Sequence, residues 1–123
     1  MTPQPAVSAD NEVYELLRLA IERRQPLTAV YEEQQRLLCP HVLGRKSGRL
    51  RVFCYQFGGA SNSVVGEVTG WRCLAVEKLT RVQWCQDTWH TGPRSGKQTC
   101  VDEVDFDTDA PYDQFLSDAA TSE

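Results

Sequence analysis

The stretch RLRVFCYQFGGASNSVVGEVTGWRCLAVEKL, which runs from Arg49 to Leu79, decides the fold. Its first segment, Arg49–Phe57, alternates between two sets of side chains, as a strand with two different faces does. One set is Leu50, Val52, Cys54 and Gln56, and the other is Arg49, Arg51, Phe53 and Tyr55. The pattern predicts a strand whose first set packs inward and whose arginines and aromatic rings share the other face.

A second strand is predicted over Gly70–Leu79. There Trp71, Cys73 and Ala75 fall on one face, and Arg72, Leu74, Val76 and Lys78 fall on the other. The connection contains GGASNS, Gly58–Ser63, a polar glycine-rich run that breaks strands and exposes backbone N–H groups.

Length and composition fit one domain of 123 residues, with 41% apolar residues and no apolar run near the roughly 20 that a spanning helix needs. The N-terminus lacks the basic and apolar regions of a secretory signal. Five cysteines, an odd number without an export signal, predict reduced thiols and a cytoplasmic location.

Charge is distributed unevenly along the chain. Residues 12–84 hold 11 Lys or Arg against 7 Asp or Glu, whereas residues 85–123 hold 2 against 9. The first part is therefore net +4 and the second net −7, which predicts a basic body that attracts anionic ligands and an acidic C-terminal tail.

The segments before Arg49 are expected to pack against the stretch from Arg49 to Leu79 and support it. Residues 1–9 predict a disordered leader, and the apolar stripe of residues 10–24 predicts a helix that Pro26 ends. Strands are expected over 27–33 and 36–43 around a turn at 34–35, with a bulge, bend or edge at Pro40, which has no N–H to donate.

After Leu79 we expect a short strand at 80–84, a loop at 85–99 and an acidic tail, with residues 100–106 as a possible edge strand. The domain would thus span 10–84, and 85–123 would be an extension. Together these elements predict a mainly β fold: a small, strongly bent antiparallel barrel with an N-terminal helix.

The order and spacing of these elements resemble the WYL domain family. The resemblance covers Ala20–Ile21, Leu27, Tyr31, Pro40, Gly48–Tyr55, Trp71–Arg72 and Leu74–Leu79, and its strongest part is WRCLAVEKL. It implies a Sm-like, SH3-type barrel that senses a nucleotide or single-stranded nucleic acid, mostly within bacterial transcription regulators. The chain departs from the family pattern at Phe53–Cys54–Tyr55, at Ala75 in place of an arginine, and in having no preceding helix-turn-helix segment.

Arg72 is the first candidate for a ligand contact, because a guanidinium can hold a phosphate by two parallel hydrogen bonds. The alternative is a structural arginine paired with Glu67 or Glu77. Ser61 and Ser63, beside the Gly58–Gly59 amides, could cradle an anion, or they could belong to a plain exposed loop.

Arg51 and Tyr55 belong to a strand face that mixes cations with rings, a combination that suits single-stranded nucleic acid. Alternatively, the arginines are solvated and the rings pack under the helix. His41 is expected to project into a pocket with Tyr31 and Tyr55.

No motif places a catalytic nucleophile, and no paired short cysteine spacing indicates zinc, so we expect a non-enzymatic protein without cofactor or metal. Our first hypothesis is a module that binds an anionic small ligand or single-stranded nucleic acid. The alternative is a protein-interaction or assembly module that has lost its ligand; a protein partner or homo-oligomer fits either, and no membrane association is expected. The tail from Asp102 could also fold over the basic face and compete with the ligand.

Overall fold

The computed structural model describes residues 9–59, 69–93 and 98–108. Its elements in chain order are α1 (Ala9–Arg23), β1 (Leu27–Tyr31), β2 (Gln34–Lys46), β3 (Arg49–Gly59), β4 (Gly70–Ala75), the 3-10 helix η2 (Val76–Lys78), β5 (Thr80–Trp84) and β6 (Glu103–Asp107). The leader before residue 9 and the tail after residue 108 lie outside the described residues.

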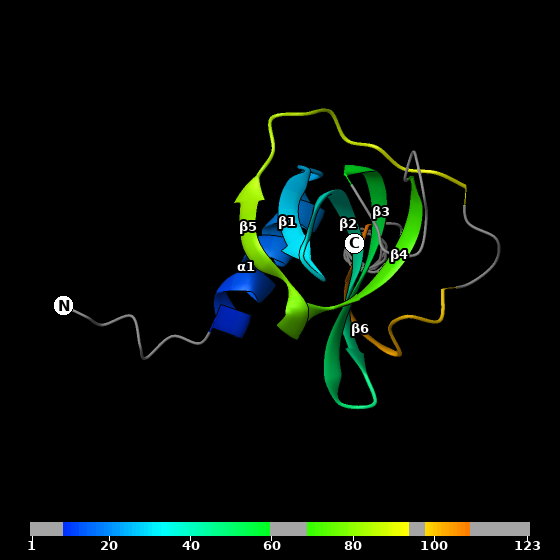
Figure 1. Cartoon of the computed structure of the whole chain (residues 1–123). Coiled ribbons are helices and arrows are strands. Elements are labelled where there is room, and N and C mark those ends of the chain that lie inside the picture. The colour runs from blue at the N-terminus through cyan, green and yellow to red at the C-terminus, as the bar shows by residue number, and fades with distance from the viewer. Residues whose placement is uncertain (1–8, 60–68, 94–97, 109–123) are drawn as a thin grey trace.

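Six antiparallel strands form one sheet in the order β4-β3-β2-β1-β5, and β6 pairs with β2 off this path (Figure 1). The long strand β2 pairs with three other strands. Its first half pairs with β1 and its second half with β6 along one edge, and β3 pairs with it along the other edge. The predicted mainly β class with one N-terminal helix is therefore confirmed. The described residues show no pairing between β4 and β5 that would close the sheet into a barrel.

Helix α1 packs against one face of the sheet, which we call the inner face. Its apolar stripe buries Leu17, Ala20 and Ile21, as the spacing of these residues predicts. The strands contribute Leu27, Ala29, Leu38, Leu43, Val52, Cys54 and Leu74 to the same core. Alternation along β3 is confirmed, since Val52, Cys54 and Gln56 are fully buried.

The first hairpin turns earlier than predicted. Glu32 and Glu33 form the turn with φ of 53° and 67°, and Tyr31 pairs with Gln34. Two consecutive positive φ values are the conformation of the tight two-residue turn that suits the twist of paired strands. The expected turn at 34–35 is therefore wrong by two residues.

Two other boundaries also differ. The strand predicted over Gly70–Leu79 ends at Ala75, and Val76–Lys78 form η2 instead. Beyond the loop, Glu103–Asp107 join the sheet as β6, so at least this part of the predicted extension is built into the fold.

Pro40 marks a bulge, which is one of the three alternatives that the sequence left open there. Pro40 pairs with Cys54 and Val42 with Phe53, which leaves His41 as the extra residue on β2. A bulge re-aims the side chains around it. His41 and Val42 consequently both contact residues of the outer face, opposite α1.

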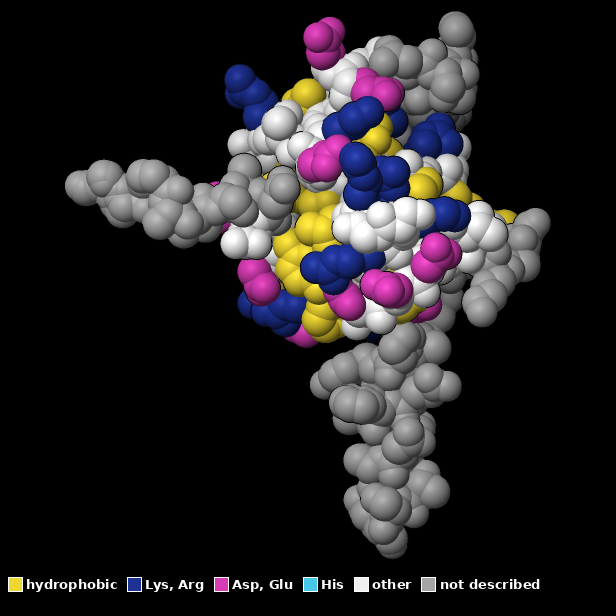
Figure 2. All heavy atoms as spheres, turned by 90° about the horizontal axis from the view of Figure 1, so that it is seen from below, with side chains coloured by type: hydrophobic (Ala, Val, Ile, Leu, Met, Phe, Trp, Pro, Cys, Tyr) yellow, Lys and Arg dark blue, Asp and Glu magenta, His cyan; other side chains and the backbone are white. Residues whose placement is uncertain are grey.

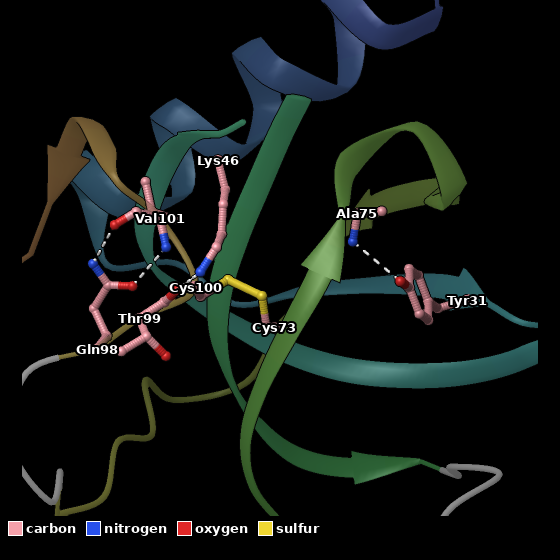
Figure 3. The surroundings of a disulfide bond; sticks show 8 residues. All are labelled: Tyr31, Lys46, Cys73, Ala75, Gln98, Thr99, Cys100 and Val101. Atoms are coloured by element: carbon pink, nitrogen blue, oxygen red, sulfur yellow. Dashed lines mark hydrogen bonds between the residues drawn. A yellow bond between two sulfur atoms is a disulfide. The ribbon is translucent and has the colours of Figure 1, made fainter. Parts of the chain in front are cut away.

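Cys73 and Cys100 form a disulfide with a Cα–Cα distance of 5.5 Å, which lies within the usual range for such bonds. It joins β4 to the segment before β6, which lies far from β4 in the sequence (Figure 3). The expectation that all five cysteines are reduced thiols is therefore wrong for this pair, whereas Cys39, Cys54 and Cys85 are free.

In the part of the chain that the structure describes, no helix has the length and apolar character needed to cross a membrane.

Candidate anion-binding site

Polar side chains replace the apolar core at one part of the inner face. Tyr31 follows Ala29 on β1, Arg36 precedes Leu38 on β2, and Arg72 precedes Leu74 on β4. Because each pair is two residues apart on a strand, both members share a face. We call Tyr31, Arg36 and Arg72 the arginine cluster.

Arg36 is the most unusual member of the cluster, since only 2% of it is exposed. Its register partner on β1 is Ala29, a core residue. Because paired residues share a face of the sheet, the Arg36 side chain also lies on the inner face. The guanidinium carbon lies 5.0 Å from the centroid of the Tyr31 ring, a cation–π contact. Its nearest carboxylate is Glu32, at 3.5 Å and on a half-exposed side chain.

The charge of Arg36 is poorly compensated. Its Nε is buried and donates to no acceptor. Burial lowers the pKa of Arg36, the Glu32 carboxylate opposes that change, and the positive charge of Arg72 lowers the pKa further. Desolvation and the nearby positive charge of Arg72 both disfavour the charged form of Arg36, and the Glu32 carboxylate offsets them only in part.

Arg72 repeats this pattern from β4. Its Nη1 donates to the carbonyl oxygen of Trp71 at 3.0 Å, and its buried Nε has no acceptor. The structural alternative, an ion pair with Glu77, is not observed, because the Glu77 carboxylate lies 3.8 Å from Arg49 instead. Glu67 lies outside the described residues.

Tyr31 links the cluster across the sheet. Its hydroxyl oxygen accepts a hydrogen bond from the Ala75 backbone N–H at 3.1 Å (Figure 3). Since β2 and β3 separate β1 from β4 in the strand order, this contact requires a strongly bent sheet. The accepted bond leaves the Tyr31 O–H hydrogen able to donate in turn.

His41 and Tyr55 do not join Tyr31, so the expected pocket of these three residues is wrong. The bulge turns His41 to the outer face, where its ring lies between those of Trp71 and Trp89, with centroids 4.8 and 4.9 Å away. Its Nδ1 contacts the Cys39 carbonyl oxygen at 2.7 Å, and its Nε2 the Thr91 hydroxyl at 2.9 Å. Tyr55 meets Trp71 edge to face at 5.2 Å.

This outer aromatic cluster is packing rather than an open stacking platform. Phe53 stacks on Trp71 at 4.8 Å, and the Trp71 indole N–H donates to the Pro93 carbonyl oxygen at 2.8 Å. At Gly92 even a Cβ would lie only 2.6 Å from the Tyr55 ring. The loop after β5 therefore packs onto the rings of β3 on the face opposite α1, so the alternative that these rings pack under the helix is wrong.

The expected basic surface is largely paired. Arg45 lies 3.6 Å from Asp105, Arg49 pairs with Glu77, and the Lys46 ammonium donates to the Thr99 carbonyl oxygen at 2.7 Å. On the face shown in Figure 2, Lys and Arg side chains are interspersed with Asp and Glu rather than forming a field of one sign. Arg51 instead lines a hollow on the outer face, together with Lys46 and the disulfide.

Ser61 and Ser63, the predicted anion-cradling loop residues, lie outside the described residues. Of the remaining candidates, Tyr31 and Arg72 come together, whereas His41, Tyr55 and Arg51 lie on the other face. Arg36 was missed. Arg36 lies two residues before the apolar Leu38, and this spacing could have indicated that both side chains share the buried face. The expected turn at residues 34–35 instead placed Arg36 opposite an exposed residue.

The three free thiols show no sign of activation. Burial raises the pKa of Cys39 to about 11 and, still more strongly, the pKa of Cys54; it also raises the pKa of Cys85. Thiols with raised pKa values carry little nucleophilic thiolate. Among the described residues, no three His, Cys, Asp or Glu side chains are arranged to hold a metal ion.

Comparison of the chain with protein-family models, with curated proteins and with solved structures finds no match in any of the three.

Proposed function

We propose that this protein is a non-catalytic module that binds a small anionic ligand through the arginine cluster. The observation that carries the proposal is the pair of partly or fully buried guanidiniums, Arg36 and Arg72, whose Nε–H groups donate to nothing. An arginine that is buried only for structure normally finds acceptors for all its buried N–H groups, whereas here Glu32 and the Trp71 carbonyl oxygen serve only the terminal nitrogens. A phosphate between the two would accept from both and neutralise both.

Beside the arginine cluster lies one further polar group that a bare phosphate would leave unsatisfied. Gln34, the register partner of Tyr31 across the Glu32–Glu33 turn, has a buried Oε1 atom that accepts no hydrogen bond. A ligand with an anionic group and an N–H or O–H donor would satisfy the arginines and this acceptor together. A nucleotide has both, and it is the ligand class that we propose.

The resemblance to the WYL domain family belongs to the same proposal, as does a regulatory role. The Tyr31–Ala75 hydrogen bond, which spans a strongly bent sheet, supports the idea that the strands curl toward a Sm-like barrel. The absence of a Glu77 partner for Arg72 favours ligand binding over a protein-assembly module, in which a fully paired arginine would be expected.

The test is isothermal titration with a mononucleotide and with its uncharged nucleoside. We expect the nucleotide alone to bind, and Arg72→Gln to weaken binding by about 10- to 100-fold, since a charge-assisted hydrogen bond contributes roughly 1.5–3 kcal/mol. Arg49→Gln is the matched control, because Arg49 is 68% exposed by side chain and lies away from the cluster.

Equal affinities of nucleotide and nucleoside, or binding that Arg72→Gln leaves unchanged, would contradict the proposal. A short single-stranded DNA in the same titration tells a mononucleotide ligand from an oligonucleotide. Binding of the strand should weaken with salt in proportion to the number of phosphates held.

A further inference from the structure

The Cys73–Cys100 disulfide lies at a hollow on the outer face, away from the arginine cluster. The hollow measures about 480 Å³ and is lined by Lys46, Arg51, Phe53, Cys73, Thr99 and Cys100. This volume falls within the roughly 300–1,000 Å³ typical of small-molecule sites. The hollow therefore combines a reactive bond with two cations.

The two cysteines of this bond differ in exposure. Cys73 is exposed on β4, whereas Cys100 is only 5% exposed. A thiolate that enters from the hollow therefore reaches the Cys73 sulfur first. Attack at one sulfur of a disulfide expels the other as a thiolate.

Two cations line the hollow together with this bond. Lys46 is anchored by its 2.7 Å hydrogen bond to the carbonyl oxygen of Thr99, the residue before Cys100, and Figure 3 shows its side chain reaching toward the disulfide. Arg51 lies on β3, two residues before Phe53, which is the register partner of Cys73. Both residues line the hollow from which a thiolate would reach Cys73.

We propose that this hollow is a thiol-exchange site that selects anionic low-molecular-weight thiols and carries them as a mixed disulfide on Cys73. The thiolate of the small molecule attacks the Cys73 sulfur, a new S–S bond forms, and the Cys73–Cys100 bond breaks. Cys100 leaves as a thiolate, which Lys46 and Arg51 stabilise until it takes a proton from water. A second thiol then releases Cys73, so that two small thiols are oxidised to their disulfide and the protein gains two electrons.

Selection arises because the cations raise the local concentration of negatively charged thiols and stabilise both the incoming and the departing thiolate. The carboxylates of a tripeptide thiol such as glutathione could contact Lys46 and Arg51 while its sulfur reaches Cys73. A cationic thiol of similar reactivity would be repelled.

The experiment follows adduct formation on the oxidised full-length chain by acid quenching and intact-mass spectrometry. Glutathione, 2-mercaptoethanol and cysteamine serve as anionic, neutral and cationic probes, and each rate constant is expressed per thiolate. We expect glutathione to react about 3- to 10-fold faster than the neutral thiol, and cysteamine to be the slowest. Peptide mapping should place the first adduct on Cys73.

The Lys46→Gln/Arg51→Gln double variant should lose this order and react with the anionic and neutral probes at similar rates. Arg81→Gln, which removes an exposed charge from β5, a strand that contributes no residue to the lining of the hollow, should keep it. A salt series on the unaltered protein tests the same point without any variant, since screening should remove the preference for glutathione. Equal rates for all three probes, an order insensitive to salt, or a first adduct on Cys100 would overturn the proposal.

Discussion

The inner face of the sheet has an apolar part and a polar part, and the two differ in how well their buried groups are satisfied. Under α1, the side chains of Leu27, Leu38 and Val52 fill a dry core in which each is almost fully buried. In the arginine cluster, Arg36 is as completely buried and Arg72 partly so, yet both retain a buried Nε–H group without an acceptor. The first part favours stability, whereas the second leaves polar groups uncompensated, and we propose that a bound ligand compensates them.

Leu38 and Arg36 allow the sharpest test of this contrast, since they lie two residues apart on the same face of β2. Leu38→Ala should lower the free energy of unfolding by about 3 kcal/mol, the usual cost of lost apolar contacts and a cavity. Denaturant titration measures it. A loss below about 1 kcal/mol would mean that this part of the face is not tightly packed.

Gly59 is the next largest expected effect, because β3 passes close to the backbone of Arg36 there. Gly59 has φ of +89°, and a Cβ at this position would lie 2.7 Å from the Arg36 Cα atom. Gly59→Ala should cost about 2 kcal/mol from strain and displaced backbone, measured by denaturant titration.

Gly48→Ala is the matched control for this substitution. Gly48 has φ of +80°, and a Cβ added there would meet no atom within 4 Å, so only the conformational cost of about 1 kcal/mol remains. Equal losses at the two glycines would show that close approach to Arg36 is not important.

Arg36→Met should have the opposite sign. Replacing a poorly compensated buried charge with an apolar side chain of similar length should raise the free energy of unfolding by about 1 kcal/mol without ligand. Our proposal also predicts that a nucleotide raises the melting temperature of the unaltered protein, and this variant should lose that rise. Destabilisation by Arg36→Met would identify Arg36 as a structural residue and remove the contrast.

The smallest expected effect concerns Tyr14, at the border of the apolar part. Its hydroxyl donates to Asp105 of β6 at 2.6 Å, and burial, followed by this hydrogen bond, raises its pKa to about 12. A raised tyrosine pKa favours the neutral form in the folded state, so its stabilisation is complete below the unfolded pKa of about 10 and is lost as the pH rises above it.

Stability of the unaltered protein should therefore fall more steeply above pH 10 than that of Tyr14→Phe, which has no hydroxyl to ionise. Parallel pH profiles from thermal unfolding would show that the Tyr14–Asp105 hydrogen bond does not contribute. The comparison of the two proteins cancels the other groups that titrate in this range.

The sequence alone predicted the elements whose patterns are local. The apolar stripe of α1, the alternation of β3, the strand at 80–84 and the irregularity at Pro40 each depend on residues a few positions apart. Local patterns of this kind directly reflect helix and strand geometry.

The arginine cluster could not be predicted completely because it depends on register. A turn at 34–35 would place Arg36 opposite Glu33, as an exposed ion pair. The actual turn at Glu32–Glu33 places it opposite the buried Ala29. Both turns fit the polar run of residues 32–35, so only the paired strands decide which side chain is buried.

Contacts between segments that are distant in the sequence could not be predicted either. Nothing in the spacing of Cys73 and Cys100 indicates that they meet, because the fold of the intervening chain brings them together. The pocket expected for His41 failed for a related reason: the bulge was one of the predicted alternatives, but the face to which it turns the ring was not predicted.

The double use of β2 has a consequence for how the chain folds. Its first half pairs with β1 across a two-residue turn, whereas its second half waits for β6, whose Phe106 pairs with Leu43 from a distant part of the chain. Closing so long a loop is entropically costly and slow compared with forming a hairpin. The β1–β2–β3 meander is therefore expected to assemble first, and the nascent edge of β2 stays open to other strands until β6 arrives.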